Sequence, residues 1–321
     1  MRFATIDSRG HPVPNSPPAS VLQSLSDDLA AAVAAASPSL VAIHARRRIP
    51  STGVIWSPDV VVTAHHTVQR DERIGVTLAD GTTVGATLAG RDATTDLAVL
   101  RLERDVGRPI ARAESGTARV GQIVLALGMP GPSVTAALGV VSAAGGEWRT
   151  WHGGRIDQFI RLDIAIYDGF SGGPAVDASG RMLGLNSSGL ARASAMTIPL
   201  ATIERVAGQL LASGHVRRGY VGLGVQPVRL PAGLVRGHAL PREAGLMVVS
   251  IEEGGPAHAA GVALGDVIVS CEGTPVSDPA ELLAALTGER VGTPVALRLL
   301  RGGVPREIAV TVGERPRRGE E

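Results

Sequence analysis

The sequence predicts a mainly β protein, built as antiparallel sandwiches or barrels, followed by a smaller α+β unit. From Leu40 to Pro199, short apolar runs recur between turns rich in Gly, Pro, Asp and Asn, and many short strands at this spacing are typical of such folds. The last part, from Gly219 to about Gly313, has strands of its own, one helix over Asp278–Leu286 and a terminal hairpin. With 321 residues, the chain is long enough for two or three domains.

Each element follows from a local pattern, starting with a helix predicted over Val21–Ala36. Leu22, Leu25 and Leu29 recur at helical spacing, and Pro38 ends the pattern. The preceding residues 1–20 are polar and contain several prolines, so we expect a flexible tail there. The strands predicted next are Leu40–His44, Val54–Trp56, Val60–Thr63, Gly75–Leu78, Leu97–Leu102, Ile123–Leu127, Ser133–Val141, Phe159–Ile164, Ala175–Val176, Met182–Asn186 and Ala195–Ile198.

A second helix, over Pro199–Ser213, is predicted to close the β-rich part. Ile203, Val206 and Leu210 supply its helical spacing. A short linker is expected at 215–218, before the strands of the last part begin. The expected domains are therefore 21–214 and 215–314, with a charged tail at 315–321.

Composition and charge exclude several classes of function. The net charge of +1 gives no argument for binding nucleic acid or a charged membrane surface. The single cysteine, Cys271, excludes an internal disulfide framework and lies in an apolar run, where we expect it to be buried. Residues 1–20 lack the apolar core of a secretory signal, and no run of about 18 apolar residues indicates a membrane span. We therefore expect a cytoplasmic protein without a membrane span, a cofactor or a metal.

The stretch from Asp163 to Pro174 places Ser171 between glycines, directly after an apolar run that predicts a strand. Glycines at this point allow a sharp turn and let backbone N–H groups point into open space. An oxyanion hole needs two such donors aimed at one point beside a nucleophile. A glycine-rich turn with an ordinary surface serine explains this stretch equally well when it is considered alone.

A histidine and a carboxylate that could activate Ser171 occur earlier in the chain. His66 follows an apolar run, and Asp96 directly precedes another. A serine hydroxyl is a weak nucleophile and needs a neutral histidine as base, with a carboxylate that holds the ring in the correct tautomer. His65 and Asp92 are the alternatives. We expect His65 to face the other side of the strand end, and Asp92 to be a turn residue.

These three segments resemble those of the HtrA (Deg) family of trypsin-like serine proteases. The family pattern Thr-x-x-His matches Thr63–His66, and Thr-Asp-Leu-Ala-Val-Leu matches Thr95–Leu100. The pattern Asp-x-Ala-Ile-x-x-Gly-Asn-Ser-Gly-Gly-Pro matches Asp163–Pro174. Phe170 stands where the family usually has Asn or Asp, a side chain that helps to hold the loop. We therefore expect the oxyanion hole to be less firmly set here.

The resemblance implies a chymotrypsin-like fold of two six-stranded β-barrels with the catalytic cleft between them. It assigns His66 as the base and Asp96 as the orienting carboxylate, both from the first barrel. It assigns Ser171 of the second barrel as the nucleophile, with the N–H groups of Gly169 and Ser171 as the oxyanion hole. In this layout the residue six positions before the serine, Ala165, lies at the bottom of the primary pocket. Because it carries no charge, we expect cleavage after small or medium apolar residues.

The last part of the chain resembles a PDZ domain, with Gly254–Ala257 followed by Ala260–Ile268 as its most specific match. In such domains the backbone N–H groups of one loop receive the carboxylate of a peptide C-terminus, and the next strand edge pairs with the peptide. That loop matches four consecutive residues, Tyr220, Val221, Gly222 and Leu223.

The resemblance therefore implies a serine endopeptidase that cleaves unfolded or damaged proteins and is regulated or supplied with substrate by its PDZ domain. Its partners would be protein or peptide substrates and peptide C-termini. A helix like that over Val21–Ala36 is often used for trimer contacts in the family, so a homotrimer is expected, although simple packing on the barrel explains the helix as well.

Two other classes of protein remain open at this point. Gly169 to Gly173 also fits the Gly-x-Ser-x-Gly elbow of esterases, but that elbow is followed by a helix, whereas Pro174 and a turn follow here. The second alternative is a catalytically inert PDZ scaffold that binds protein C-termini, which the unusual Phe170 keeps open.

Overall fold

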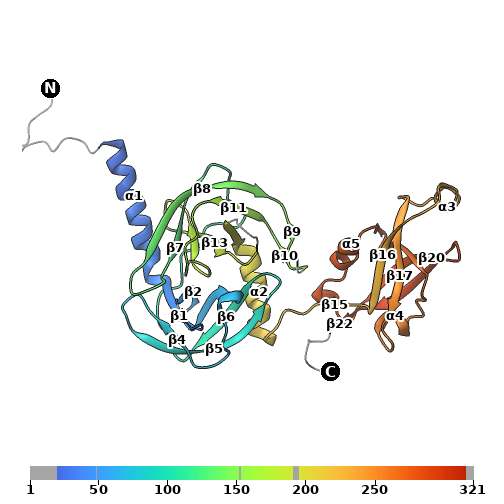
Figure 1. The fold of residues 1–321 in the computed structure, drawn as a ribbon, viewed down its shortest axis with the longest axis horizontal. Helices are drawn as coiled ribbons and strands as arrows, with labels where there is room; N and C mark the ends of the chain where they lie inside the picture. Colours follow the sequence, from blue (N-terminus) through green and yellow to red (C-terminus); the bar gives the residue numbers. More distant parts are fainter. Residues whose placement is uncertain (1–19, 48, 152, 191–194, 316–321) are drawn as a thin grey trace, which may run out of the picture. The chain divides into compact units, whose positions relative to one another are not determined.

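The computed structural model describes residues 20–47, 49–151, 153–190 and 195–315. The tails predicted at 1–20 and 315–321 lie almost entirely outside these ranges. Contacts divide the chain into two compact units (Figure 1). The predicted domain boundary between residues 214 and 215 stays a prediction. No described helix combines the length and the apolar character that a membrane crossing requires. One unit contains Met1–Leu88, Ala98–Trp148 and Ile156–Glu204, and the other contains Ala89–Leu97, Arg149–Arg155 and Arg205–Glu321.

The first helix, α1, spans Val21–Ala36, as predicted. Its start is capped by the hydroxyl of Ser20, which accepts a hydrogen bond of 3.1 Å from the N–H of Gln23. Ala32 and Ala36 are buried, whereas the apolar side chains of the first turns are largely exposed. The short 3₁₀ helix η1, Ser37–Ser39, then leads into the first strand. Only the C-terminal part of α1 is therefore packed within this chain.

Six strands form a first closed barrel, in the order β1-β2-β3-β6-β5-β4. Its interior is filled by β-branched and aliphatic residues, including the fully buried Val41, Ile43 and Ile74. The ten-residue β5 was not predicted, because its many Gly, Ala and Thr residues give a weak apolar pattern. The strands are β1 Leu40–His44, β2 Ser51–Ser57, β3 Val60–Ala64, β4 Ile74–Thr77, β5 Thr83–Asp92 and β6 Leu97–Leu102.

A second closed barrel has the order β11-β14-β13-β12-β7-β8 and is followed by helix α2, Leu200–Ser213. Together the two barrels confirm the double six-stranded architecture that the resemblance implies. A separate two-stranded sheet of β9 and β10 was not predicted, because each strand has only two residues. The strands are β7 Ile123–Gly128, β8 Thr135–Gly145, β9 Trp148–Arg149, β10 Arg155–Ile156, β11 Phe159–Asp163, β12 Pro174–Val176, β13 Met182–Ser187 and β14 Ala195–Pro199.

The C-terminal residues form the predicted α+β unit, whose main sheet runs in the order β16-β17-β18-β20-β21. This order places β16 at an edge of the sheet, and helix α5 contacts it. Cys271 is buried in the core of this unit, and burial raises the pKa of its thiol. The elements are β15 Gly219–Tyr220, β16 Leu223–Arg229, α3 Ala232–Gly237, β17 Ala244–Ile251, α4 Pro256–Ala259, β18 Val267–Cys271, β19 Thr274–Pro275, α5 Pro279–Ala285, η3 Gly288–Arg290, β20 Pro294–Arg301, β21 Val304–Thr311 and β22 Gly313–Glu314.

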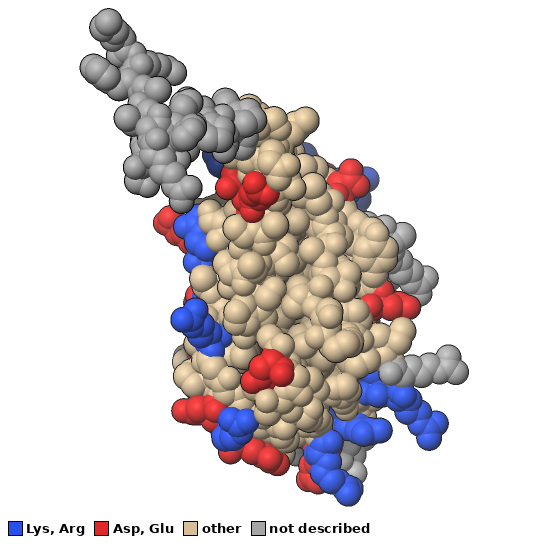
Figure 2. Space-filling view, turned by 90° about the vertical axis from the view of Figure 1, so that its left-hand side faces the viewer, with Lys and Arg blue, Asp and Glu red and all other residues tan. Residues whose placement is uncertain are grey.

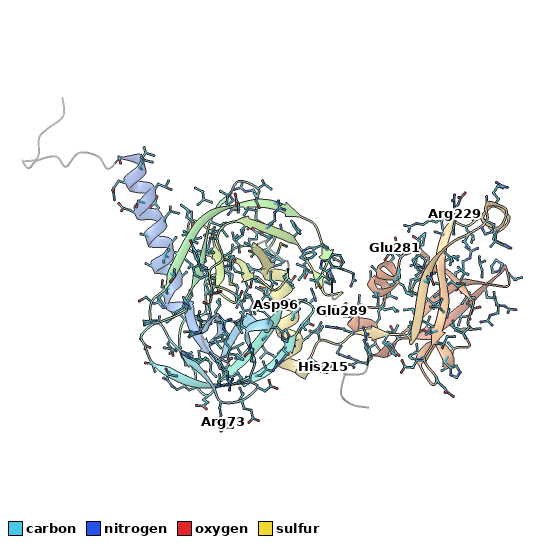
Figure 3. The ribbon with its side chains drawn as sticks, viewed as in Figure 1. Arg73, Asp96, His215, Arg229, Glu281 and Glu289 are labelled. Carbon is cyan, nitrogen blue, oxygen red and sulfur yellow. The ribbon has the colours of Figure 1, made fainter. Side chains whose placement is uncertain are left out.

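The predicted helix and hairpin of this unit both form. Asp278 caps α5 in a reciprocal capping box with Glu281, which is labelled on α5 in Figure 3. Strands β20 and β21 pair from end to end, and the turn between them has Gly302 and Gly303 at φ values of 56° and 84°. Two successive positive φ values are typical of the tight turn that matches the twist of a hairpin.

Candidate active site

The loop between β11 and β12 carries Ser171, whose side chain and backbone are 6% exposed. Gly169 precedes it at a φ of 90°, in the left-handed region that favours glycine. A Cβ atom on Gly169 would lie 2.6 Å from Pro130 Cβ, so a larger residue cannot be accommodated there without a shift. The buried Thr52 hydroxyl donates to the carbonyl oxygen of Gly169 at 2.6 Å and accepts from the N–H of Met129 at 2.7 Å. One side chain of the first barrel thus fixes this loop of the second.

Backbone hydrogen bonds around Ser171 leave two donors available. Phe170, Gly172 and Gly173 donate their N–H groups to backbone carbonyl oxygens, at 3.1, 2.9 and 2.9 Å. Within the described part of the chain, no acceptor is hydrogen-bonded to the N–H of Gly169 or of Ser171. These are the two groups that the sequence assigns to an oxyanion hole.

Phe170 is fully buried, with 0% of its surface exposed. Its ring packs edge-on against Tyr167, with 5.5 Å between the ring centroids and 78° between the planes. It also lies directly over Gly128, where any side chain would collide with the ring. Burying a phenylalanine contributes about 1.5–3 kcal/mol. Phe170 therefore packs the loop against the second barrel, and the expectation of a less firmly set oxyanion hole stays a prediction.

The candidate base, His66, lies immediately after β3 in the 3₁₀ helix η2, His65–Thr67. The Thr67 hydroxyl donates to the carbonyl oxygen of Ala64 at 2.8 Å and stabilises this turn. The sequence analysis expects the side chains of His65 and His66 to point to opposite sides of a strand end. That reason is wrong, because both residues lie in a 3₁₀ helix. Because a 3₁₀ helix has about three residues per turn, their side chains still leave the backbone about 120° apart.

The structure connects His66 and Ser171 through a residue that the sequence analysis does not single out, Ser188. Its hydroxyl lies 2.9 Å from Ser171 Oγ and 3.4 Å from His66 Nε2. Its backbone N–H also donates to Ser171 Oγ at 3.3 Å. Ser188 directly follows β13, and no spacing or motif marks it, since the contacts arise only from the closed barrels.

Asp96 is buried, with 4% of its surface exposed, and directly precedes β6. In the first barrel β6 is a neighbour of β3, the strand that leads to His66. Asp96 has a φ of 56°, which is uncommon for a residue other than glycine. Such a conformation costs on the order of 1–3 kcal/mol and is a recurrent feature of functional sites.

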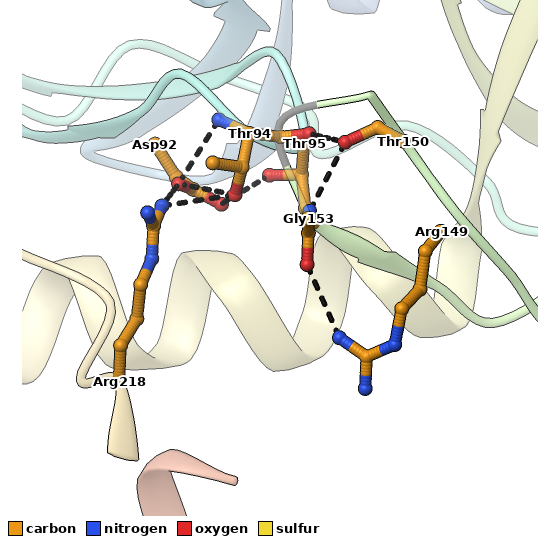
Figure 4. Close-up of polar contacts among 8 residues, drawn as sticks. Asp92, Thr94, Thr95, Arg149, Thr150, Gly153 and Arg218 are labelled. Carbon is orange, nitrogen blue, oxygen red and sulfur yellow. Dashed lines mark hydrogen bonds and ion pairs between the residues drawn. The ribbon is translucent and has the colours of Figure 1, made fainter. Parts of the chain in front are cut away.

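Asp92, the alternative carboxylate, organises the turn that precedes Asp96 (Figure 4). Its Oδ1 accepts from the N–H and the hydroxyl of Thr94, at 3.2 and 2.8 Å, and its Oδ2 accepts from the Thr95 hydroxyl at 2.7 Å. Arg218 Nη2 completes the set with an ion pair of 2.6 Å to Oδ1. The carboxylate of Asp92 is thus fully used in the turn, as predicted.

The remaining predicted site residues differ in their exposure. Ala165 is exposed in the segment between the end of β11 and the Ser171 loop. In the C-terminal unit, Val221 is buried and Gly222 has a φ of 73°. Tyr220 ends β15, and Leu223 begins the edge strand β16. The turn thus leads directly into an edge that can accept a further strand.

Comparison with known proteins places both parts of the chain in families. Residues 51–185 match the trypsin-like peptidase domain, and residues 219–312 match the PDZ domain. The protein named "Probable periplasmic serine endoprotease DegP-like" from Brucella suis is 37% identical over 282 residues, which are 85% of this chain and 54% of the relative. The protein of the same name from Chlamydia trachomatis is 34% identical over 278 residues, 84% of this chain and 55% of the relative. The chain therefore spans about half the length of the curated relatives it matches.

Solved structures match over nearly their whole length. The HtrA-type protease AlgW with a tripeptide is 30% identical, with a TM-score of 0.72 over 90% of this chain and 98% of that one. A serine endoprotease from Yersinia pestis is 28% identical, with a TM-score of 0.73 over 94% of this chain and 100% of that one. With its two barrels, its Ser171 loop and its C-terminal PDZ domain, the chain belongs to the HtrA-type family of trypsin-like serine proteases.

Proposed function

We propose that this chain is a serine endopeptidase that cleaves unfolded or damaged proteins with a triad of His66, Asp96 and Ser171. One observation carries the proposal. The Ser171 hydroxyl shares a hydrogen-bonded partner with His66 Nε2, directly beside two backbone N–H groups that have no acceptor within the described chain. A nucleophile, a base and two oxyanion donors in one place are the requirements of acyl transfer to a serine.

The proposed reaction follows from these roles. Ser171 Oγ attacks a peptide carbonyl carbon while its proton passes to His66, whose ring Asp96 holds in the correct tautomer. The N–H groups of Gly169 and Ser171 stabilise the oxyanion, a contribution of about 3–4 kcal/mol per donor in measured enzymes. His66 then protonates the leaving amine, and water releases the acyl group from Ser171.

The decisive test uses a fluorophosphonate label together with cleavage of an unfolded protein. Wild type should be labelled on Ser171 and should cleave, whereas Ser171→Ala should do neither. Ser142→Ala is a matched control, because Ser142 lies on β8 and its hydroxyl bonds to the carbonyl oxygen of Arg161. Peptide binding by a wild-type chain that is neither labelled nor active would support the alternative, an inert PDZ scaffold that binds protein C-termini.

For substrate preference, we propose cleavage after small or medium apolar residues such as Val, Ala or Leu. Ala165 supports this, because it is exposed beside the Ser171 loop and offers no carboxylate to attract Arg or Lys. A peptide library should therefore show apolar residues before the cleaved bond. Ala165→Asp should move the preference toward basic residues, and a basic preference in wild type would contradict the proposal.

For the PDZ domain, we propose capture of peptide C-termini by the turn of Tyr220, Val221, Gly222 and Leu223, regulating the protease or supplying its substrate. The edge position of β16 supports pairing of the peptide with this strand. A peptide with a free C-terminal carboxylate should bind, and its C-terminally amidated form should not. Equal binding of both forms would exclude a carboxylate-binding turn.

For assembly, we propose the homotrimer that the family resemblance implies. Val21 and Leu22 of α1 are 86% and 78% exposed, and Figure 2 shows a broad central area without charged side chains on the face that carries α1. Light scattering should give three chains per particle for wild type, and Leu22→Asp should lower this number. A monomeric wild type would contradict the proposal. Location in the cytoplasm stays a prediction.

A further inference from the structure

A pocket outside the proposed active site lies within one compact unit of the chain. Every described residue that lines it belongs to the unit made of Ala89–Leu97, Arg149–Arg155 and Arg205–Glu321. Its volume of about 150 Å³ is roughly ten times the ~10–15 Å³ that a single water molecule needs. The described lining includes none of the residues proposed for catalysis or for peptide binding. The pocket is therefore a separate space that is large enough for a small ligand.

The lining of this pocket is strongly basic. Among the described residues, six arginines and two carboxylates line it, which leaves four positive charges in excess. These residues are Arg149, Arg155, Arg205, Arg217, Arg218 and Arg315, with Asp92 and Glu289. Glu314 pairs with Arg217 at 3.2 Å, and three positive charges remain in excess when it is counted as well. Because the whole chain has a net charge of only +1, this excess is a local property of the pocket.

Two of these arginines, Arg149 and Arg218, are held by contacts that use only part of their hydrogen-bonding capacity (Figure 4). Nη1 of Arg149 donates to the carbonyl oxygen of Gly153 at 3.1 Å. Nη2 of Arg218 donates to Asp92 at 2.6 Å and to the Thr94 hydroxyl at 2.9 Å. Within the described chain, the other nitrogens of these two guanidinium groups have no acceptor. A guanidinium carries five N–H donors in a planar fork that matches a phosphate. Both groups are therefore oriented and still have donors for an anion.

We propose that this pocket binds a small anion with two linked phosphoryl groups, either inorganic pyrophosphate or the diphosphate of a nucleotide. A phosphoryl group carries about 1.5–2 negative charges at pH 7, so two of them match the three to four positive charges in excess. The arginines in the pocket repel one another, and a ligand that neutralises them removes this repulsion. The inference goes beyond the proposed function and does not depend on it.

The test is titration calorimetry of the full chain with pyrophosphate, phosphate and ADP, at one fixed ionic strength because salt screens exposed charges. One pyrophosphate should bind per chain, at least about tenfold more tightly than phosphate, because the second phosphoryl group adds charge-assisted hydrogen bonds. ADP that binds at least as tightly as pyrophosphate would assign the diphosphate to a nucleotide, and weaker binding of ADP would assign it to inorganic pyrophosphate. Absence of pyrophosphate binding, or equal affinity for phosphate, overturns the proposal.

Variants locate the binding in this pocket. Arg149→Ala and Arg217→Ala each remove one guanidinium group from the lining and should weaken pyrophosphate binding at least about tenfold. If one of them fails to fold, the other still tests the site. Arg229→Ala is the matched control, because this exposed arginine of the same unit pairs with Glu243 outside the pocket and its loss should leave the affinity unchanged. Equal weakening in the control overturns the proposal, since attraction by overall charge would then explain the binding. A chain that binds pyrophosphate but is not labelled at Ser171 would contradict the proposed function alone.

Discussion

The best single test of the structural argument is Thr52→Val, which removes one buried hydroxyl while preserving the shape of the side chain. Thr52 lies on β2 and is 0% exposed. Its hydroxyl bonds to the carbonyl oxygen of Gly169 at 2.6 Å and to the N–H of Met129 at 2.7 Å. Valine can make neither bond, so a buried acceptor and a buried donor both lose their partner.

The expected loss of stability follows from these two groups. Each buried polar group without a partner costs about 1–3 kcal/mol, and together they cost about 2–6 kcal/mol. The added methyl group of valine returns about 0.8 kcal/mol through burial. We therefore expect Thr52→Val to lower the free energy of unfolding by about 1–5 kcal/mol. Fluorophosphonate labelling should also slow, because the carbonyl group of Gly169 is no longer fixed beside the proposed oxyanion hole.

Tryptophan fluorescence during urea unfolding measures this change selectively. Trp56 and Trp148 belong to the unit that contains most barrel strands, so their signal reports on the barrels. Trp151 belongs to the other unit, but it is 96% exposed, so its surroundings change little on unfolding. Thr117→Val is the matched control, because the exposed Thr117 hydroxyl donates to a carbonyl oxygen at 2.7 Å and its loss should cost less than about 0.5 kcal/mol. Equal effects of the two variants would refute the reasoning.

Two further predictions concern charged groups. Arg218→Ala should lower stability by about 1–2 kcal/mol in the same fluorescence assay, because the Asp92 side chain that it pairs with at 2.6 Å is only 2% exposed. Arg101→Ala, whose ion pair to Asp59 in the first barrel is exposed on both sides, should have no measurable effect, and equal losses would contradict the prediction. Hydrogen bonds from Arg242 and from backbone N–H groups lower the pKa of Glu281 from its ordinary value of 4.5 to about 2. Because the pKa is lower in the folded state, this stabilisation is present above about pH 4.5 and is lost as the pH falls toward 2. Calorimetry across this window should show a steeper fall of the PDZ unfolding temperature in wild type than in Glu281→Gln, and parallel curves would contradict the prediction.

Much of the fold could be predicted because its signals are local. The helical spacing of apolar residues gave α1 its bounds of Val21–Ala36, and Asp278 marked the start of α5. Short apolar runs gave most strands of both barrels. The pattern failed for β5, Thr83–Asp92, whose small residues form a strand because neighbouring strands of the closed barrel pair with it.

The candidate active site also has features that the sequence shows and features that only the structure shows. The glycines around Ser171 and the runs beside His66 and Asp96 are visible in the sequence, because each residue type at those places is tied to a local backbone requirement. The packing around the Ser171 loop could not be seen in the sequence. Phe170 stands where the family usually has Asn or Asp, and only the structure shows that its ring is buried and packs over Gly128.

By itself, the sequence determined the order of the elements, the double-barrel and PDZ architecture through family resemblance, and the candidate catalytic residues. Tertiary structure alone decided that Ser188 lies between Ser171 and His66, at sequence separations of 17 and 122 residues. It also decided that Thr52 fixes Gly169 across 117 residues. Hydrogen bonds depend on distances of a few tenths of an ångström between side chains, and these distances are set only when the barrels close and their cores pack.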